Sequence, residues 1–413
     1  MDYSKIISKH KLSQKEQKAM LTKIDLTLKK INSEFTSEGI EAQAVLGGSA
    51  AKSTMLKGDF DVDVFARFDY SFKNKNISDI LGNVLARHFQ IDRVQGSRDY
   101  YQFTQAGLNY EIVPVLKIDN YRQALNVTDA SPLHVDWVKK YTSRNPKLID
   151  QILLTKIFLK ANSLYGAESY IRGFSGHVVD ILTIHYSSFE KLLQAASRWQ
   201  YGELIDPEKH YTGSLNKSKK GALIIIDPVQ PERNAAAALS TANFNRFREL
   251  AELYMQKPSE KYFVKQKFSV SKLKSNAKPN KLILLEVKPS EGKKDVVGAK
   301  LLKAFMYIRI QLKHYDFKLI DAGWNWDNKQ KAIFWYIVDK TPLSKTRKHQ
   351  GPPLKAKQHV KAFKAQHKNT FIENNKIHAT LKREYTKPEQ LIKFLIKEDY
   401  LKQRIKSINP TYF

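Results

Sequence analysis

The chain has 413 residues, 42% of them hydrophobic and 27% charged, which is enough for roughly two to four domains with buried cores. The formal net charge of +29 favours a polyanionic partner, above all nucleic acid. The absence of cysteine excludes disulfides, thiolate nucleophiles and thiolate zinc sites. Neither a signal peptide nor an apolar run long enough to cross a bilayer is visible, so we expect a cytoplasmic protein with no membrane partner.

The first 146 residues are expected to form a mixed α/β domain. Ser13 and Glu16 have capping-box spacing, and they precede a helical run of apolar residues at Leu21, Ile24, Leu28, Ile31 and Phe35. The predicted elements that follow are strands at 44–46, 60–65 and 108–116 and a short helix at 50–57.

Residues 147–265 are expected to form a mostly helical domain. It contains predicted helices at 150–164, 178–199 and 243–255, a polar loop at 201–220 and a buried strand at 222–226.

Residues 266–413 form the third predicted domain. A strand, a helix and two strands, at 282–287, 296–313, 317–323 and 332–338, resemble half of a ferredoxin-like RNA-binding domain. Residues 341–413 then hold 17 Lys and Arg against 5 Asp and Glu, an excess of +12 (17 minus 5). This basic tail could be a solvated face, but its interleaved aromatic residues favour a nucleic-acid surface.

Asp61 and Asp63 are two residues apart in a predicted strand, so their carboxylates point to the same face. Glu111, in another predicted strand, could supply a third carboxylate. Oxygen ligands of this kind suit Mg²⁺ or Mn²⁺, and two ions could serve in-line attack on a nucleotide α-phosphate. A D-x-D pattern alone is weak evidence, because most such pairs lie at the surface or bind Lys and Arg.

The sequence Gly47-Gly48-Ser49 lies between a predicted strand and a short helix, upstream of the two aspartates. Glycine lets a backbone approach a ligand closely, and free amides at a helix start bind phosphate. The Ser49 hydroxyl and Lys52 could add to that binding. The turn therefore predicts a triphosphate cradle beside a metal pair.

These motifs resemble the polymerase-beta-type nucleotidyltransferases and, more narrowly, the archaeal class I CCA-adding enzymes. The resemblance covers residues from about 40 to about 395. It rests on Gly48-Ser49-Ala50-Ala51-Lys52 with Asp61-Val62-Asp63, on Arg172-Gly173-Phe174-Ser175-Gly176, on Asp227-Pro228-Val229 with Arg233-Asn234, and on Tyr385-Thr386-Lys387-Pro388-Glu389.

The resemblance implies an α+β multidomain fold: a mixed-sheet, palm-like nucleotidyltransferase domain, a mostly helical central domain, and a ferredoxin-like RNA-binding domain with a basic tail. It implies that Asp61, Asp63 and Glu111 bind two Mg²⁺ ions, or Mn²⁺, and are catalytic. It also implies nucleotide-binding roles for Gly48, Ser49, Lys52, Thr54, His134, Lys156, Tyr165 and Arg233, the last of which would help to read the base.

Each of these residues also has a simpler interpretation. Lys156 could face solvent, Tyr165 could be a core aromatic, and His134 could be a surface histidine with its hydrogen bonds satisfied. Arg233 could be the ion-pair partner of Glu232 or Asp227.

Three departures from the family pattern are visible. The family commonly has Glu, Asp and Asp where this chain has Asp61, Asp63 and Glu111. An expected Arg is Lys52, which keeps the charge but loses the fork geometry, and an expected His aligns loosely with Arg98. We expect these changes to affect nucleotide preference and not the type of reaction.

The leading hypothesis is template-independent addition of CCA to tRNA 3′ ends from CTP and ATP. A poly(A) polymerase or another RNA-tailing enzyme is the alternative within the class. A non-catalytic RNA-binding protein is the alternative outside it, disfavoured because all three carboxylates are present. The oligomeric state stays open, with a homodimer as one alternative.

Overall fold

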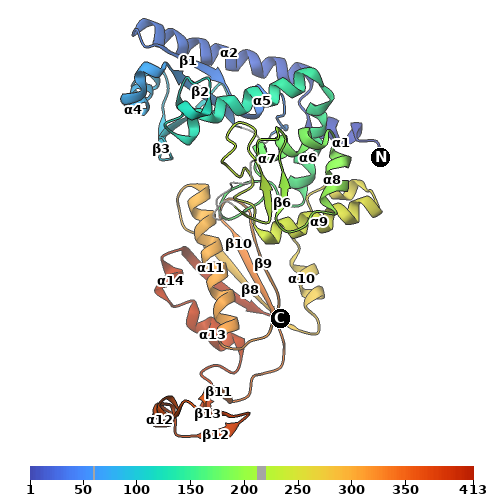
Figure 1. Ribbon diagram of the computed structural model, residues 1–413, viewed down its shortest axis with the longest axis vertical. Helices are drawn as coiled ribbons and strands as arrows, with labels where there is room; N and C mark the ends of the chain where they lie inside the picture. Colours follow the sequence, from blue (N-terminus) through green and yellow to red (C-terminus); the bar gives the residue numbers. More distant parts are fainter. Residues whose placement is uncertain (59–60, 212–219) are drawn as a thin grey trace. The chain divides into compact units, whose positions relative to one another are not determined.

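The computed structural model describes residues 1–58, 61–211 and 220–413, which form two compact units, Met1–Gln266 and Lys267–Phe413 (Figure 1). Phe60 of the predicted strand 60–65 and residues 212–219 of the predicted loop 201–220 lie outside the described residues. In the part of the chain that the structure describes, no helix is long and apolar enough to span a membrane.

Unit 1 begins with a short helix α1 (Ser4–His10) and a long helix α2 (Gln14–Ser37). The predicted capping box is present at the start of α2, where the amide of Glu16 donates to the Ser13 side chain and the Glu16 carboxylate accepts from the Ser13 amide. Ile24, Ile31 and Phe35 are buried along one face of α2, as helical spacing predicts.

A five-stranded mixed sheet follows, in the order β1-β2-β5-β4-β3. Strands β2 and β5 at its centre are parallel, and the other neighbours are antiparallel. The strands are β1 (Ala42–Leu46), β2 (Val62–Phe68), β3 (Asp92–Val94), β4 (Tyr100–Gln105) and β5 (Leu108–Leu116).

The two faces of this sheet are covered differently. On one face, residues of α2 and α4 (Ile77–Ala86) form a core with Val62, Val64 and the other alternate residues of β2. On the other face, Phe65 packs with Val115 of β5 and Val135 of α5 (Ser131–Arg144). Because side chains alternate along a strand, Asp61 and Asp63 lie on the same face as Phe65.

The helix α3 (Gly48–Ala51) is shorter than the predicted helix 50–57. It ends at Ala51 with Lys52 as its C-cap, and the left-handed φ of +57° at Ser53 stops the helix.

The rest of unit 1 is mostly helical. It contains the helices α6 (Lys147–Ala161), α7 (Gly176–Tyr186), α8 (Phe189–Ala196) and α9 (Thr241–Gln256) and the parallel pair of strands β6 (Glu203–Ile205) and β7 (Leu223–Ile225).

Two predictions for this part were wrong. The single helix predicted at 178–199 is broken into α7 and α8, because Ser187 takes a left-handed φ of +65° and Ser188 caps the new helix. The predicted loop 201–220 contains β6, whose partner β7 follows the loop in the chain.

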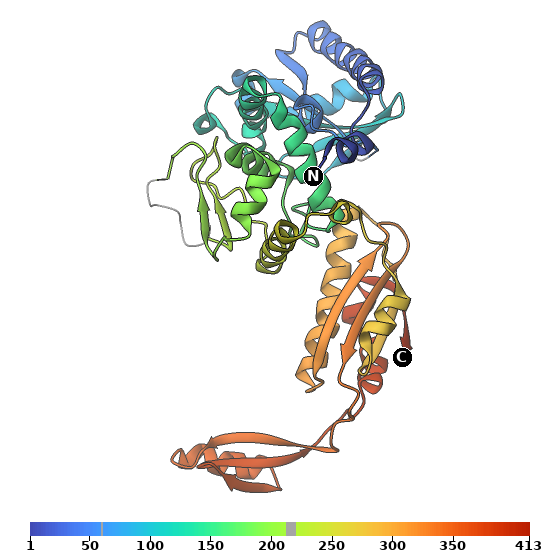
Figure 2. The same ribbon diagram turned by 90° about the vertical axis from the view of Figure 1, so that its right-hand side faces the viewer.

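Unit 2 contains an antiparallel sheet in the order β14-β8-β10-β9, and helix α11 lies along it (Figure 2). Its members are β8 (Lys281–Pro289), α11 (Lys294–His314), β9 (Leu319–Trp326), β10 (Ala332–Val338), α13 (Pro388–Leu395) and β14 (Ile405–Tyr412). The predicted strand-helix-strand-strand order is present. With α13 and β14 it makes the β-α-β-β-α-β order of ferredoxin-like folds.

Residues 341–413, predicted as a basic tail, are folded elements of unit 2. β14 pairs with β8, and Leu391 and Ile392 of α13 are fully buried in the core of the sheet.

The remaining elements of unit 2 are a three-stranded sheet and three helices. The strands are β11 (Thr346–Pro353), β12 (Thr370–Glu373) and β13 (Lys376–Lys382), and the helices are α10 (Val270–Ala277), α12 (Lys357–Gln366) and α14 (Asp399–Lys402).

Candidate active site

Three carboxylates gather where β2 and β5 run side by side. Asp63 is the register partner of Glu111 in the parallel pair, and Asp61 comes directly before β2. Asp61 and Glu111 line an open pocket of about 430 Å³, which Gln102 also lines. The amide of Gln102 donates to Glu111 over 2.5 Å and so fixes the direction of its carboxylate.

Burial raises the pKa of the Asp63 carboxyl to about 6, and the negative charges of Glu111 and Asp61 act in the same direction. The nearby charge of Lys52 and the backbone amide of Ser49 act against this rise. Carboxylates that repel each other in this way have the donor set that a divalent cation bound through oxygen would stabilise. The residues present therefore fit the expected Mg²⁺.

The glycine turn packs directly on Asp63. The amide of Gly47 donates to the Asp63 carbonyl over 2.8 Å, and Gly48 takes a left-handed φ of +51°. A Cβ at Gly48 would lie 1.6 Å from Oδ2 of Asp63. Gly48 thus leaves room for the Asp63 carboxylate, and the Ser49 amide hydrogen-bonds to it. The role of both residues in a triphosphate cradle stays a prediction.

Lys52, Thr54 and Lys156, which are predicted to bind the nucleotide, are held in buried contacts. Nζ of Lys52 lies 2.5 Å from Oδ2 of Asp180, and only 11% of the Lys52 side chain is exposed. Nζ of Lys156 donates to the carbonyl and to Oγ1 of Thr54, both over 3.0 Å. Burial lowers the pKa of Lys156 to about 8, although the charge of Asp180 opposes the shift.

His134 and Arg233 meet at a buried carboxylate, that of Asp227. Nε2 of His134 lies 2.9 Å from Oδ1 of Asp227, and Nη1 of Arg233 lies 3.2 Å from Oδ2. The simpler interpretation of Arg233, an ion-pair partner of Asp227, therefore describes its contact here. Half of the Arg233 side chain remains exposed, which leaves it able to reach a ligand.

Asp227 is anchored by its own loop. It accepts hydrogen bonds from the amides of Val229 and Gln230, over 2.9 Å and 3.1 Å. Burial by itself would raise the pKa of Asp227, but the contacts with His134 and His177 outweigh it and hold that pKa well below its usual range. Asp227 is thus a buried anion around which His134, His177 and Arg233 are arranged.

Tyr165 belongs to the packing of unit 1. It forms an isolated bridge with Phe174, packs against the core of unit 1, and lies beneath Nζ of Lys160, 4.5 Å from the ring centroid. A Cβ on Gly176 would lie 2.9 Å from the Tyr165 hydroxyl, so glycine leaves room for that group at the start of α7.

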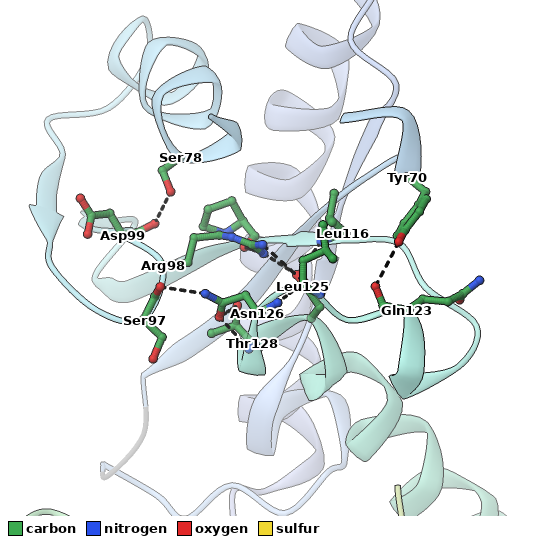
Figure 3. Close-up of polar contacts among 12 residues, drawn as sticks. Tyr70, Ser78, Ser97, Arg98, Asp99, Leu116, Gln123, Leu125, Asn126 and Thr128 are labelled. Atoms are coloured by element: carbon green, nitrogen blue, oxygen red, sulfur yellow. Dashed lines mark hydrogen bonds and ion pairs between the residues drawn. The ribbon is translucent and has the colours of Figure 1, made fainter. Parts of the chain in front are cut away.

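Arg98, which aligns loosely with a family histidine, is part of a structural cluster and not of the carboxylate group (Figure 3). Its guanidinium pairs with the fully buried Asp129 and donates to the carbonyl of Pro114 over 3.2 Å. Asp129 also accepts from the amides of Leu116 and Leu125. The cluster ties the segment after β5 to the end of that strand.

Sequence reasoning missed Asp180 and His177, although both lie near predicted site residues. Asp180 carried a usable signal, because it interrupts the apolar run Val178–Val179 and Ile181–Leu182 of a predicted helix. A fully buried charge needs a partner, and Lys52 is that partner. His177 gave no such signal.

Comparison with known families matches both units of the chain. Residues 150–264 match the second domain of tRNA nucleotidyltransferases, and residues 280–408 match the C-terminal domain of CCA-adding enzymes.

Relatives that match most of the chain are also CCA-adding enzymes. The chain is 34% identical over 350 residues to the CCA-adding enzyme of Nanoarchaeum equitans, covering 83% of this chain and 84% of that protein. It is 29% identical over 399 residues to the CCA-adding enzyme of Pyrobaculum islandicum, covering 93% and 91%. Among solved structures it is similar to Cid1 poly(U) polymerase, with a TM-score of 0.51 and 16% identity over 63% of this chain and 97% of Cid1. The latter likeness concerns the fold alone.

Proposed function

Because the chain belongs to the CCA-adding enzyme family, we propose that it adds CCA to the 3′ end of tRNA from CTP and ATP and releases pyrophosphate. The structural observation that carries the proposal is the pairing of Asp63 with Glu111 on adjacent parallel strands, with Asp61 at the start of one of them. The proposed substrate is consistent with a cytoplasmic site of action.

In the proposed mechanism Asp61, Asp63 and Glu111 would hold two Mg²⁺ ions, and Mn²⁺ would suit the same oxygen ligands. Such ions supply activation of the RNA 3′ hydroxyl and neutralisation of the leaving pyrophosphate. The chain itself holds the carboxylates in place, through the Ser49 amide at Asp63 and the Gln102 amide at Glu111. With a pKa of about 6, Asp63 is mostly ionised at neutral pH.

The nucleotide-binding set is proposed to consist of Gly48, Ser49, Lys52, Thr54, His134, Lys156, Tyr165 and Arg233. Lys52 would contact the triphosphate beside its counter-ion Asp180. For Thr54 and Lys156 the same contact would require opening the hydrogen bonds between them. Arg233 would help to select C or A, because its guanidinium is the half-exposed member of the Asp227 cluster.

Three functional parts are proposed: a palm-like catalytic domain at 1–146, a nucleotide- and tRNA-binding domain at 147–265, and an RNA-binding domain at 266–413. The last part would bind the tRNA acceptor stem and elbow mainly through phosphates, since tRNA bodies vary in sequence. If so, tRNA affinity falls steeply as salt rises. A flat salt response would argue against an electrostatic surface.

The test is incorporation of labelled nucleotides into one tRNA that ends before CCA, with CTP alone, ATP alone and both, in Mg²⁺. Two C residues followed by a single A are expected. A ladder of A residues from ATP alone would instead indicate a tailing polymerase and would remove the role of Arg233 in selecting C.

The control separates catalysis from binding. The double variant Asp61→Ala with Asp63→Ala should stop transfer and leave tRNA binding largely intact. Continued nucleotide addition by this variant would contradict the proposed metal site. If the wild-type protein bound tRNA but never extended it, that result would favour the alternative of a non-catalytic RNA-binding protein.

A further inference from the structure

A group of three possible metal ligands lies in unit 1 apart from the three carboxylates, and it includes His134 of the proposed nucleotide-binding set. His134 is in the first turn of α5, His177 is in the first turn of α7, and Asp227 follows β7. One ligand atom from each of the three residues lies within 4.8 Å of the other two. Three elements that are distant in sequence thus bring two imidazoles and a carboxylate to one point.

The distances between the two imidazoles and the Asp227 carboxylate are close to those between neighbouring ligands of a metal ion. Nε2 of His134 is 2.9 Å from Oδ1 of Asp227, and Nε2 of His177 is 3.4 Å from Oδ2. Neighbouring ligands around a tetrahedral ion with bonds of about 2.0–2.1 Å are roughly 3.3–3.5 Å apart, so small movements would complete the set. The Asp227 carboxylate is already held in place by the amides of Val229 and Gln230, which act as an outer shell.

His177 is the least well satisfied member of the cluster. Its Nε2 atom is buried and has an ion-pair contact of 3.4 Å with Oδ2 of Asp227, which lacks hydrogen-bond geometry in the described part of the chain. A buried polar atom without a hydrogen bond is costly and calls for an explanation. A bound cation would satisfy it, because a neutral imidazole nitrogen is a good metal ligand.

The geometry points to a second metal site, in which His134, His177 and Asp227 bind one divalent transition-metal ion of the Zn²⁺ or Co²⁺ type. Two nitrogen ligands and one oxygen ligand select such ions over Mg²⁺, which prefers oxygen alone. Three protein ligands leave a fourth position open to water or to a ligand oxygen.

Arg233 competes with the ion. Its Nη1 lies 3.2 Å from the Asp227 oxygen that His177 faces, so a bound cation and the guanidinium would repel each other. Because half of its side chain is exposed, Arg233 can turn toward solvent when the ion binds. Occupation of the site would therefore release Arg233 from Asp227.

The test is binding of Zn²⁺ and Co²⁺ to the full-length protein after removal of metals, in excess Mg²⁺ that saturates the oxygen-only carboxylate site. We expect one Zn²⁺ per chain by elemental analysis and a Co²⁺ absorption band typical of low coordination with nitrogen ligands. No stoichiometric Zn²⁺ under these conditions would overturn the proposal.

Variants locate the site. His134→Gln and His177→Gln should each weaken Zn²⁺ binding by more than about 100-fold, the upper end of the loss for an outer-shell partner. His185→Gln, at an exposed position of the same helix α7, is the matched control and should change nothing. Equal losses in all three variants, or none in the first two, would overturn the assignment.

Arg233→Ala supplies a second test that does not depend on the stability of the histidine variants. Removing the competing cation should tighten Zn²⁺ binding, whereas a role of Arg233 as a mere neighbour predicts no change. Weaker binding in this variant would contradict the proposed competition.

Discussion

Nζ of Lys52 and Oδ2 of Asp180 form an ion pair 2.5 Å long, and the aspartate side chain has no exposed surface. The second oxygen of Asp180 makes no hydrogen bond among the residues that the structure describes. Lys156 is also buried. Burial lowers its pKa, and the negative charge of Asp180 reduces this shift but does not cancel it. Asp180 is therefore the counter-ion of two lysines that we place at the triphosphate.

Asp180→Asn should weaken nucleotide use. Without the anion, the pKa of Lys156 falls below about 8, so a larger fraction of Lys156 is neutral at neutral pH. We expect KM for nucleotide to rise on the order of tenfold, which corresponds to a loss of about 1.4 kcal/mol in binding free energy. The alkaline limb of the pH–activity profile should also move to lower pH, which a purely structural defect would not cause. Asp150→Asn, which breaks the exposed pair with Lys11, is the control and should leave both quantities unchanged.

Gly48→Ala should damage the carboxylate site directly. The new methyl group would occupy the position of the Asp63 carboxylate, 1.6 Å from Oδ2, so Asp63 must move. Misplacing a group of the active site by about 1 Å can lower the rate on the order of 100-fold, so we expect a loss of that order in kcat. Gly39→Ala is the matched control, since Gly39 has a similar φ of +62° but no atom near its added Cβ. A kcat in Gly48→Ala equal to that of the control would contradict the proposed close fit.

Local patterns in the sequence predicted local structure well. The capping box at Ser13 located the start of α2, and the predicted strand 108–116 has the bounds of β5. The break between α7 and α8 was missed because the apolar residues continue across it, and only the left-handed backbone at Ser187 ends the first helix.

The candidate site was predictable where its residues are close in sequence, and less so where the fold joins distant ones. Asp61 and Asp63 were predicted from their spacing, and the strand positions of Asp63 and Glu111 are adjacent as that interpretation requires. No pattern links Lys52 with Asp180, 128 positions apart. The same is true of His134 and Asp227, 93 positions apart, whose contact depends on how α5 packs beside the loop after β7.

Metal-free protein should lose stability as pH rises through the range in which Asp63 titrates. The unfolded carboxyl has a pKa near 3.8 and the folded one has a pKa of about 6. Between these values the folded protein retains a proton that the unfolded chain has lost, so stability falls with rising pH. The measurement is urea unfolding in a chelator from pH 4 to pH 6, repeated with Asp63→Asn. An identical slope in the variant would show that another group is responsible.

Arg98→Met should destabilise the protein without requiring any contact with substrate. It removes the charged partner of Asp129, which is fully buried, and breaking a buried pair costs about 3–5 kcal/mol. Because backbone amides of Leu116, Leu125 and Asn126 still donate to Asp129, we expect the lower end, about 3 kcal/mol by urea unfolding.

Arg93→Met is the control for that experiment. Arg93 pairs with Asp79 and Asp99 at exposed positions, where water screens an ion pair and leaves it little effect on stability. If both variants lost the same stability, the buried cluster of Arg98 would not be what holds the segment after β5. If Arg98→Met instead lost activity at unchanged stability, Arg98 would be acting at the carboxylate site, as the histidine at its aligned position in the family would suggest.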